Sequence, residues 1–171
     1  EADGKDQPMT MNIRLSGVDI GRIRRLMDTD VECFPYLKQK PGLQQKALRL
    51  SCLGFEEEMQ NGKQNGELSF DRDVVLFFET NTPGEVIVNM TRVRDGDPVD
   101  PFSLSRAEME GRRQAWETVA FLRKHIPGFE RARLLFTGPN IGVRSSRRIT
   151  GRYRLTTEDV LSARKFPDGV A

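Results

Sequence analysis

The residues of this sequence that are best suited to bind a ligand are concentrated in one arginine-rich segment. From position 131 to position 157 the chain has seven arginines, no lysine and no acidic residue. Guanidinium groups form planar, bidentate hydrogen bonds with carboxylates and phosphates, so arginine suits such anions well. Anions must balance this charge, and they come either from acidic side chains elsewhere in the fold or from a ligand.

The centre of this segment, residues 141–155, is called the arginine stretch below. If residues 143–149 form a strand, their side chains alternate between its two faces. Arg144, Ser146 and Arg148 would then share one face, where two guanidinium groups flank a hydroxyl that could complete an anion site. Arg147 would lie on the opposite face. The candidate residues for binding a substrate or cofactor group are therefore Arg144, Ser146, Arg147 and Arg148.

A structural role for the arginine stretch is the alternative. Acidic side chains such as Glu79, Glu85 or Glu130 could pair with the arginines and hold the fold together. Nucleic-acid binding is disfavoured, because it requires basic residues interleaved with stacking aromatic side chains. Only Tyr153 lies close, and the formal net charge of the chain is +2.

The remaining reactive side chains do not form a motif. Cys33 and Cys52 have neither CxxC nor metal-ligand spacing, so we expect buried or inert thiols of unassigned role. His125 is the one histidine, which excludes a zinc site that needs two. We expect His125 to lie in the last turn of a helix, where positive charge suits the helix dipole. The sequence therefore predicts no metal site.

The elements that must position these side chains follow from periodicity and capping residues. Alternating apolar residues predict strands over 9–18, 74–78, 86–93 and 132–136, with a hairpin between the second and the third. Helices are expected over 19–27, 43–60 and 105–124, the last with an apolar face formed by Trp116, Val119, Ala120 and Leu122. The predicted caps are Asp19, the pair Ser105 and Glu108, and the pair Thr156 and Asp159. Hairpins with separate helices predict an α+β fold, a mainly antiparallel sheet with helices packed on it.

Composition is that of a soluble protein of one domain. The chain has 171 residues, of which 37% are hydrophobic and 30% charged. No apolar run approaches the roughly 18 residues of a membrane span, and residues 1–4 are polar rather than the start of a signal peptide. We therefore expect no membrane association and a cytoplasmic location.

Several segments have a pattern that is more specific than arginine content alone. In chain order they read PMTM at 8–11, GEVIVNMTRV at 84–93, PGFE at 127–130, IGVRSSRRI at 141–149, GRYRLTTEDV at 151–160 and RKFPD at 164–168. Together they resemble a family of large bacterial FAD-dependent oxidoreductases. Two positions depart from the family pattern: Ser145 and Arg152 each replace a usual glutamate. The resemblance therefore implies a more positive site and a more anionic substrate than in relatives.

The dinucleotide-binding motif GxGxxG of such flavoproteins is absent from this sequence. The resemblance therefore implies that residues 1–171 are a single substrate-side, or cap, domain excised from a longer chain. Residues 1–8 are expected to be flexible, and residues 156–171 to return toward the FAD domain. The implied partners are the FAD-binding domain of the same chain and a small anionic substrate, with no nucleic acid and no membrane.

The resemblance also implies what the parts do. The full-length protein would be an FAD-dependent oxidoreductase in which the arginine stretch places an anionic substrate or cofactor group against the flavin. The 171-residue fragment would be inactive and would not bind FAD tightly. The alternative function is a non-catalytic interdomain or subunit-assembly module whose arginines form structural salt bridges.

Overall fold

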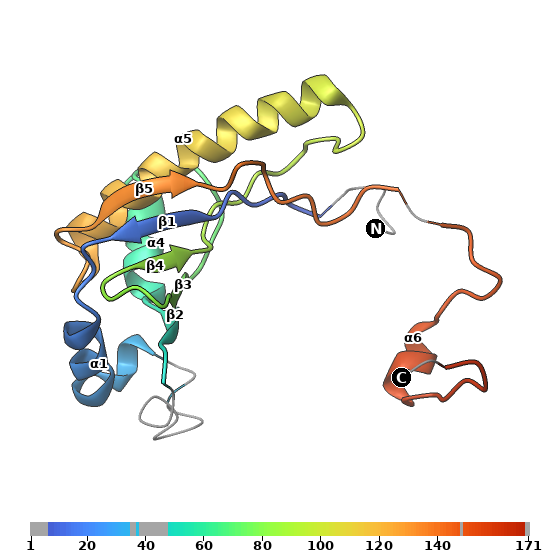
Figure 1. Cartoon of the computed structure of the whole chain (residues 1–171), viewed down its shortest axis with the longest axis horizontal. Helices are drawn as coiled ribbons and strands as arrows, with labels where there is room; N and C mark the ends of the chain where they lie inside the picture. Colours follow the sequence, from blue (N-terminus) through green and yellow to red (C-terminus); the bar gives the residue numbers. More distant parts are fainter. Residues whose placement is uncertain (1–6, 35–36, 38–47, 148, 170–171) are drawn as a thin grey trace.

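The computed structural model, which describes residues 7–34, 37, 48–147 and 149–169, is organised around a five-stranded sheet (Figure 1). The strands follow the spatial order β2–β3–β4–β1–β5, and every pairing between them is antiparallel. They are β1 (Ile13–Ser16), β2 (Ser51–Gly54), β3 (Val75–Glu79), β4 (Val86–Val88) and β5 (Arg133–Thr137). The predicted α+β fold with an antiparallel sheet is confirmed, and so is the β3–β4 hairpin.

Four α-helices and one short 3-10 helix, Val31–Cys33, accompany the sheet in the described residues. The α-helices are α1 (Ile20–Thr29), α4 (Glu56–Gln64), α5 (Pro101–His125) and α6 (Thr157–Leu161). The long helix α5 runs beside the sheet, whereas α6 lies at the end of an extended C-terminal arm, far from the sheet (Figure 1). The arm is defined here as residues 149–169.

One face of the sheet carries the main core. Inward side chains of the strands, such as Ile13, Phe77 and Val88, are at most 1% exposed. They pack with Met59 of α4 and with α5, and the Phe77 ring meets Phe129 edge-on at 5.2 Å between centroids. The helices therefore cover this face and exclude water from it.

A second, smaller core lies beyond the regular sheet. It consists of Met9, Met11, Val93, Ala107 and Ile141, with Leu104 packed against it. Its backbone is held by two isolated bridges, one between Met9 and Val93 and the other between Thr10 and Gly142. The N-terminal half of α5 therefore supports the segment that leads into the arginine stretch.

The opposite face of the sheet has no helix over it in the described structure, and its side chains line up across the strands. The register places Phe78 opposite Ile87, Ile87 opposite Arg14, and Arg14 opposite Phe136. Phe78, Ile87 and Phe136 are 39%, 40% and 54% exposed. The Arg14 guanidinium lies 5.6 Å from the Phe136 ring centroid, a cation–π distance. An apolar row is thus left open to solvent.

The predicted helix over 43–60 is wrong over residues 48–55 and confirmed over residues 56–60. Residues 51–54 form β2, and α4 begins only at Glu56, after Phe55 with a left-handed φ of 63°. Burial at Leu50, Cys52 and Gly54 has a period of two, which is the periodicity of a strand. A β-carbon at Gly54 would lie 2.2 Å from the Cys33 carbonyl oxygen, so only glycine fits this close approach. Residues 43–47 lie outside the described residues.

The predicted start and apolar face of α5 are also partly wrong. The helix begins at Pro101 and is capped by Asp100, whose side chain accepts from the backbone of Phe102 and Ser103, so Ser105 lies inside the helix. Trp116 is 64% exposed, because the buried side follows Gly111, Ala115, Val119 and Leu122. Trp116 lies about 100° around the helix from Ala115. Ala120 is also exposed, while Val119 and Leu122 are buried as predicted.

The other predicted caps are confirmed. The Asp19 side chain accepts from the Arg22 backbone at the start of α1. Thr156 and Asp159 form a complete capping box on α6, with each side chain accepting from the other residue's backbone N–H.

Candidate functional site

The arginine stretch does not continue the sheet. Gly142 forms a single bridge with Thr10, and none of residues 143–147 belongs to a strand, so the predicted strand is wrong over those residues. Thr10 precedes β1, so this isolated bridge lies outside the regular sheet. Arg148 lies outside the described residues, and no position is assigned to it.

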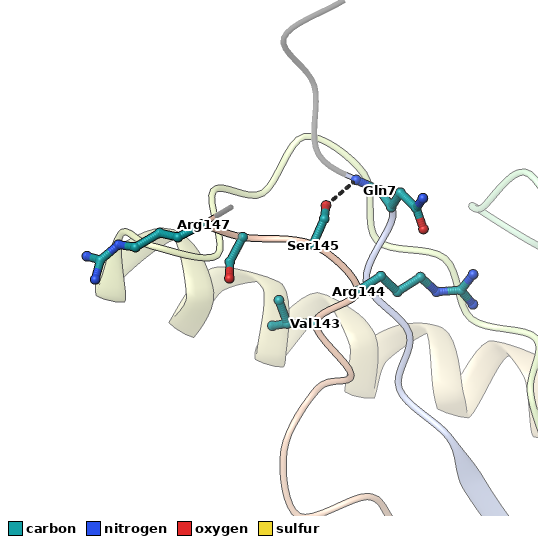
Figure 2. Close-up of a pocket in the computed structure, with 6 residues that line it drawn as sticks. Gln7, Val143, Arg144, Ser145 and Arg147 are labelled. Atoms are coloured by element: carbon teal, nitrogen blue, oxygen red, sulfur yellow. Dashed lines mark hydrogen bonds between the residues drawn. The ribbon is translucent and has the colours of Figure 1, made fainter. Parts of the chain in front are cut away.

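An open pocket of about 380 Å³ lies against the described part of the stretch. It is lined by Gln7, Val143, Arg144, Ser145, Ser146 and Arg147. The backbone N–H of Gln7 donates to Ser145 Oγ at 3.0 Å and closes one side of it (Figure 2). Arg144 and Arg147 point in opposite directions from this wall (Figure 2). The pocket thus brings three of the predicted residues together without converging the two guanidinium groups.

The acidic partners named for the structural alternative are engaged by other arginines. Glu79 pairs with Arg24 of α1 at 3.0 Å, and Glu130 pairs with Arg22 at 2.7 Å. Glu85 accepts from Nε of Arg14 in β1 at 2.8 Å. Within the described residues, the arginines of the stretch, Arg144, Arg147, Arg152 and Arg154, form no ion pair.

Arg144 turns toward a second group of arginines that the sequence did not single out. Its Nη2 donates to Thr10 Oγ1 at 3.2 Å. Arg92 lies on the other side of Thr10, because Met9 pairs antiparallel with Val93. Arg92 Nη1 in turn donates to the carbonyl of Asp71 at 3.3 Å, which brings it beside Arg72. We call Arg72, Arg92, Arg144 and Thr10 the triple-arginine cluster.

Buried hydrogen bonds hold the backbone under this cluster. The side chain of Gln114, 3% exposed on α5, accepts from the Arg92 N–H at 2.7 Å and donates to the Arg92 carbonyl at 3.2 Å. Thr91 Oγ1 accepts from the Met11 N–H at 2.7 Å and donates to the Met11 carbonyl at 2.9 Å. The backbone N–H and carbonyl groups of Arg92 and Met11 are therefore hydrogen-bonded by side chains, which fixes the backbone positions from which the Arg92 and Thr10 side chains extend.

Arg72 is a partly buried member of the cluster. Its Nε is buried and has no hydrogen-bond partner among the described residues, and its Nη2 lies 3.5 Å from the Asn89 carbonyl oxygen. Burial lowers the pKa of Arg72 from its ordinary value, and the positive charges of Arg92 and Arg144 lower it further. Nearby acids are occupied: Asp73 accepts from Lys63 at 2.7 Å and Asp71 from Arg94 at 3.1 Å.

His125 lies in the last turn of α5, as predicted, and its Nε2 is 2.8 Å from Glu67 Oε2. Lys124 donates to the same carboxylate at 3.0 Å. Hydrogen bonds from His125 and then from Lys124 lower the pKa of Glu67. This group ties the end of α5 to the segment after α4, which is a structural role.

Both cysteines are unpaired thiols in the structure. Cys52 is fully buried in β2, and burial raises its pKa far above the ordinary value. Burial also raises the pKa of the half-buried Cys33 to about 11, with a further contribution from its hydrogen bond to Asp30. The expectation that Cys52 is a buried thiol is confirmed.

In the part of the chain that the structure describes, no group of three or more His, Cys, Asp or Glu side chains could hold a metal ion. No helix within those same residues combines the length and the apolar character that crossing a bilayer demands.

The strand–helix turns of the described residues do not fit the pyrophosphate of a dinucleotide. Such a group binds at a Gly-rich turn between a parallel strand and a helix N-terminus. All strand pairings here are antiparallel. The β2–α4 turn leads into Glu56, Glu57 and Glu58, whose charges repel phosphate, and the β1–α1 turn leads into the Asp19 cap. FAD would therefore have to be held by residues outside these two turns.

Comparison with known proteins identifies one family. A family model described as FAD dependent oxidoreductase matches residues 1–171, the entire chain. No curated protein matches the sequence, and no solved structure matches it.

Proposed function

Since the chain belongs to the FAD-dependent oxidoreductase family, we propose that it forms the substrate-side, or cap, domain of such an enzyme. In this proposal residues 1–171 are one domain of a longer protein, and residues 156–171 lead back to the FAD-binding domain. The bound flavin supplies the redox chemistry, and this domain binds and orients the substrate.

The proposal rests on the described arginines of the stretch, which form no ion pair with an acidic side chain of the described residues. Glu79, Glu85 and Glu130 pair with arginines of α1 and β1, so the charge of the stretch is not neutralised by them. Arg144, Ser146 and Arg147 line an open pocket, and we assign them, together with Arg148, to an anionic group of the substrate or cofactor. Unpaired guanidinium groups at an accessible wall attract such a group and orient it through bidentate hydrogen bonds.

Two exposed apolar regions support docking of the FAD-binding domain. The open sheet face presents Phe78, Ile87 and Phe136, and the arm presents Ile149, Leu155 and Leu161, which are 94%, 64% and 78% exposed. The arm extends away from the sheet (Figure 1). Apolar side chains at such exposure gain free energy when a partner surface covers them.

The same exposed residues favour a second candidate function. An interdomain or subunit-assembly module would also present apolar side chains, and its arginines would pair with carboxylates of the partner. The two candidates differ in what the arginine stretch contacts, because one predicts a small anionic substrate there and the other a protein surface.

Kinetics of the full-length enzyme distinguish the candidates. For the cap function, Arg147→Gln should raise KM for the anionic substrate by about tenfold or more, with kcat and FAD content nearly unchanged. Arg133→Gln, which removes an exposed arginine of β5, is the control. Normal KM with loss of domain or subunit association would support the assembly function. The 171-residue protein should form no stoichiometric yellow complex with FAD, and such a complex would contradict our assignment.

A further inference from the structure

Three segments that are distant in sequence meet around Thr10. The Met9–Val93 bridge places Thr10 next to Arg92, and the Thr10–Gly142 bridge places the arginine stretch along its other side. Arg144, two residues beyond Gly142, returns over Thr10 and donates to its hydroxyl at 3.2 Å. Residues two apart on extended backbone share a face, which agrees with this contact.

This three-segment layer has an apolar face and a basic face. Met9, Met11, Val93 and Ile141 are buried against α5 in the second core. Thr10, Arg92 and Arg144 belong to the opposite face. The guanidinium groups therefore stand on a packed support, with the Arg92 backbone fixed by Gln114.

Arg72 brings a third guanidinium group to the same face. The Arg92–Asp71 hydrogen bond joins its loop to the layer, and its Nε is buried without a partner. In the part of the chain that the structure describes, none of the three arginines forms an ion pair. Burial and the mutual repulsion of the cations lower the pKa of Arg72. The charge of the nearby Asp73 carboxylate raises this pKa, but by less than burial and repulsion lower it. The cluster therefore holds like charges together at a net cost in free energy.

From this geometry we infer that Arg72, Arg92 and Arg144, with the Thr10 hydroxyl, form a binding site for a multiply charged oxyanion. Three guanidinium forks supply more donors than one carboxylate can accept, so the ligand carries at least two negative charges on several oxygens. A phosphate group or a di- or tricarboxylate has this chemistry. The inference rests on the proposed function only for identifying the ligand as the substrate of a flavoenzyme.

This site differs from the pocket of the arginine stretch in its members. Arg144 is common to both, whereas Arg147 points in the opposite direction (Figure 2). Arg72 and Arg92 do not line that pocket. Substitutions can therefore separate the two sites, and binding can be measured without any flavin.

Isothermal titration of the protein with inorganic phosphate, and separately with citrate, at constant ionic strength tests the inference. Saturable binding of at least one anion is expected, and comparison of the two shows which oxyanion chemistry the site prefers. Arg72→Gln, Arg92→Gln and Arg144→Gln should each weaken binding by about tenfold or more. Arg133→Gln, in an exposed arginine away from the cluster, should bind as the wild type does.

Three results would overturn the inference. The first is no saturable binding of either anion, as expected if the cluster pairs only with carboxylates of a partner protein. The second is binding that depends on Arg147 and Arg144 but survives Arg72→Gln and Arg92→Gln, which would place the anion in the open pocket. The third is an equal loss in Arg133→Gln, which would indicate non-specific attraction. If Arg72→Gln fails to fold, Arg72→Lys replaces it in the test, because it keeps the positive charge. Anion binding by Arg72→Lys should be weakened, because lysine lacks the planar fork.

Loss of anion binding and failure of the proposed function have different signatures. In the first case, the protein binds phosphate through the cluster, but Arg144→Gln does not change the KM of the full-length enzyme. The anion site is then supported, and its role in substrate binding is contradicted. In the second case, the protein binds neither anion, but Arg147→Gln raises the KM of the full-length enzyme. The anion site is then contradicted, and the cap function is supported.

Discussion

Gly62 of α4 packs directly on the ring of Phe121 in α5. A β-carbon at Gly62 would lie 2.5 Å from a ring carbon of Phe121, which is 1% exposed and belongs to the main core. Glycine is unfavourable inside a helix, so its presence here reflects the close approach of the two helices.

Gly62→Ala should therefore destabilise the protein, although alanine is the better helix former. Overpacking of this kind costs about 1–3 kcal/mol. Gly21→Ala is the matched control, because a β-carbon at Gly21 meets only side-chain atoms of Arg25 and Asp19 at 3.4 Å. That variant should be stabilised by a few tenths to about 1 kcal/mol. Urea unfolding of both variants measures the difference, and equal effects would refute the packing explanation.

Gln114→Ala should loosen the support of the triple-arginine cluster. The substitution leaves the N–H and the carbonyl of Arg92 without their partner, which costs about 1–3 kcal/mol for buried groups. Gln60→Ala, in an exposed glutamine of α4, is the control and should be within about 0.5 kcal/mol of the wild type. Hydrogen exchange at residues 91–93 should accelerate only in the first variant, and unchanged exchange there would contradict the role of Gln114.

Asp159→Ala should unwind α6 and leave the sheet intact. The Asp159 carboxylate accepts from the Thr156 N–H at 2.8 Å, from the Thr156 hydroxyl and from the Tyr153 hydroxyl at 2.7 Å each. Asp168→Ala, which removes an exposed carboxylate of the arm, is the control. Exchange rates at residues 157–161 and 51–54 distinguish local from global effects, and loss of protection in both segments would exclude a purely local cap.

The pH dependence of α6 follows from the same carboxylate. Hydrogen bonds, that of the Thr156 backbone first, hold the pKa of Asp159 well below its usual range. A depressed pKa in the folded state means that the contribution to stability is present above the unfolded pKa and disappears as pH falls through the folded one. Protection of α6 should therefore persist from pH 7 to pH 4. Fraying that begins near pH 5 would show that the carboxylate titrates normally.

Thiol reactivity should separate the two cysteines. With a pKa of about 11, Cys33 is almost entirely protonated at pH 8, and its labelling by a disulfide reagent should accelerate roughly tenfold per pH unit up to pH 10. Cys52 should stay unlabelled in the folded protein, because its side chain is fully buried. Cys33→Ser identifies the labelled position. Rapid labelling of two thiols at pH 8 would contradict this arrangement.

Local features of the fold were predictable from sequence, whereas long-range approaches were not. The β3–β4 hairpin and the Thr156–Asp159 capping box depend on neighbouring residues, and both were predicted. The helix expected over 43–60 fails over residues 50–54, because this segment matches either periodicity over so few residues, and pairing with β3 decides for the strand. Helical spacing places Trp116 on the predicted apolar face with Val119, although its position around α5 faces solvent.

The candidate site shows the same division. The arginine stretch was visible as composition, and its family resemblance is confirmed. Arg72 and Arg92 could not be joined to Arg144 from sequence, since their proximity depends on Met9–Met11 lying between residues 91–93 and 141–142. The sequence offered one indication of the cluster: in an extended segment, Arg92 next to an apolar Val93 is expected to point outward. That pattern does not reveal which residues of neighbouring segments lie on the same face as Arg92.

The second core has a thermodynamic consequence for whatever occupies the basic face above it. The five buried side chains of the second core, which is separate from the main core, hold the three-segment layer together. Such a small unit can melt locally while the sheet and α4 stay intact. An occupant that bridges the guanidinium groups would tie the segments to one another, so its binding and the local order of this end of the domain would be thermodynamically coupled.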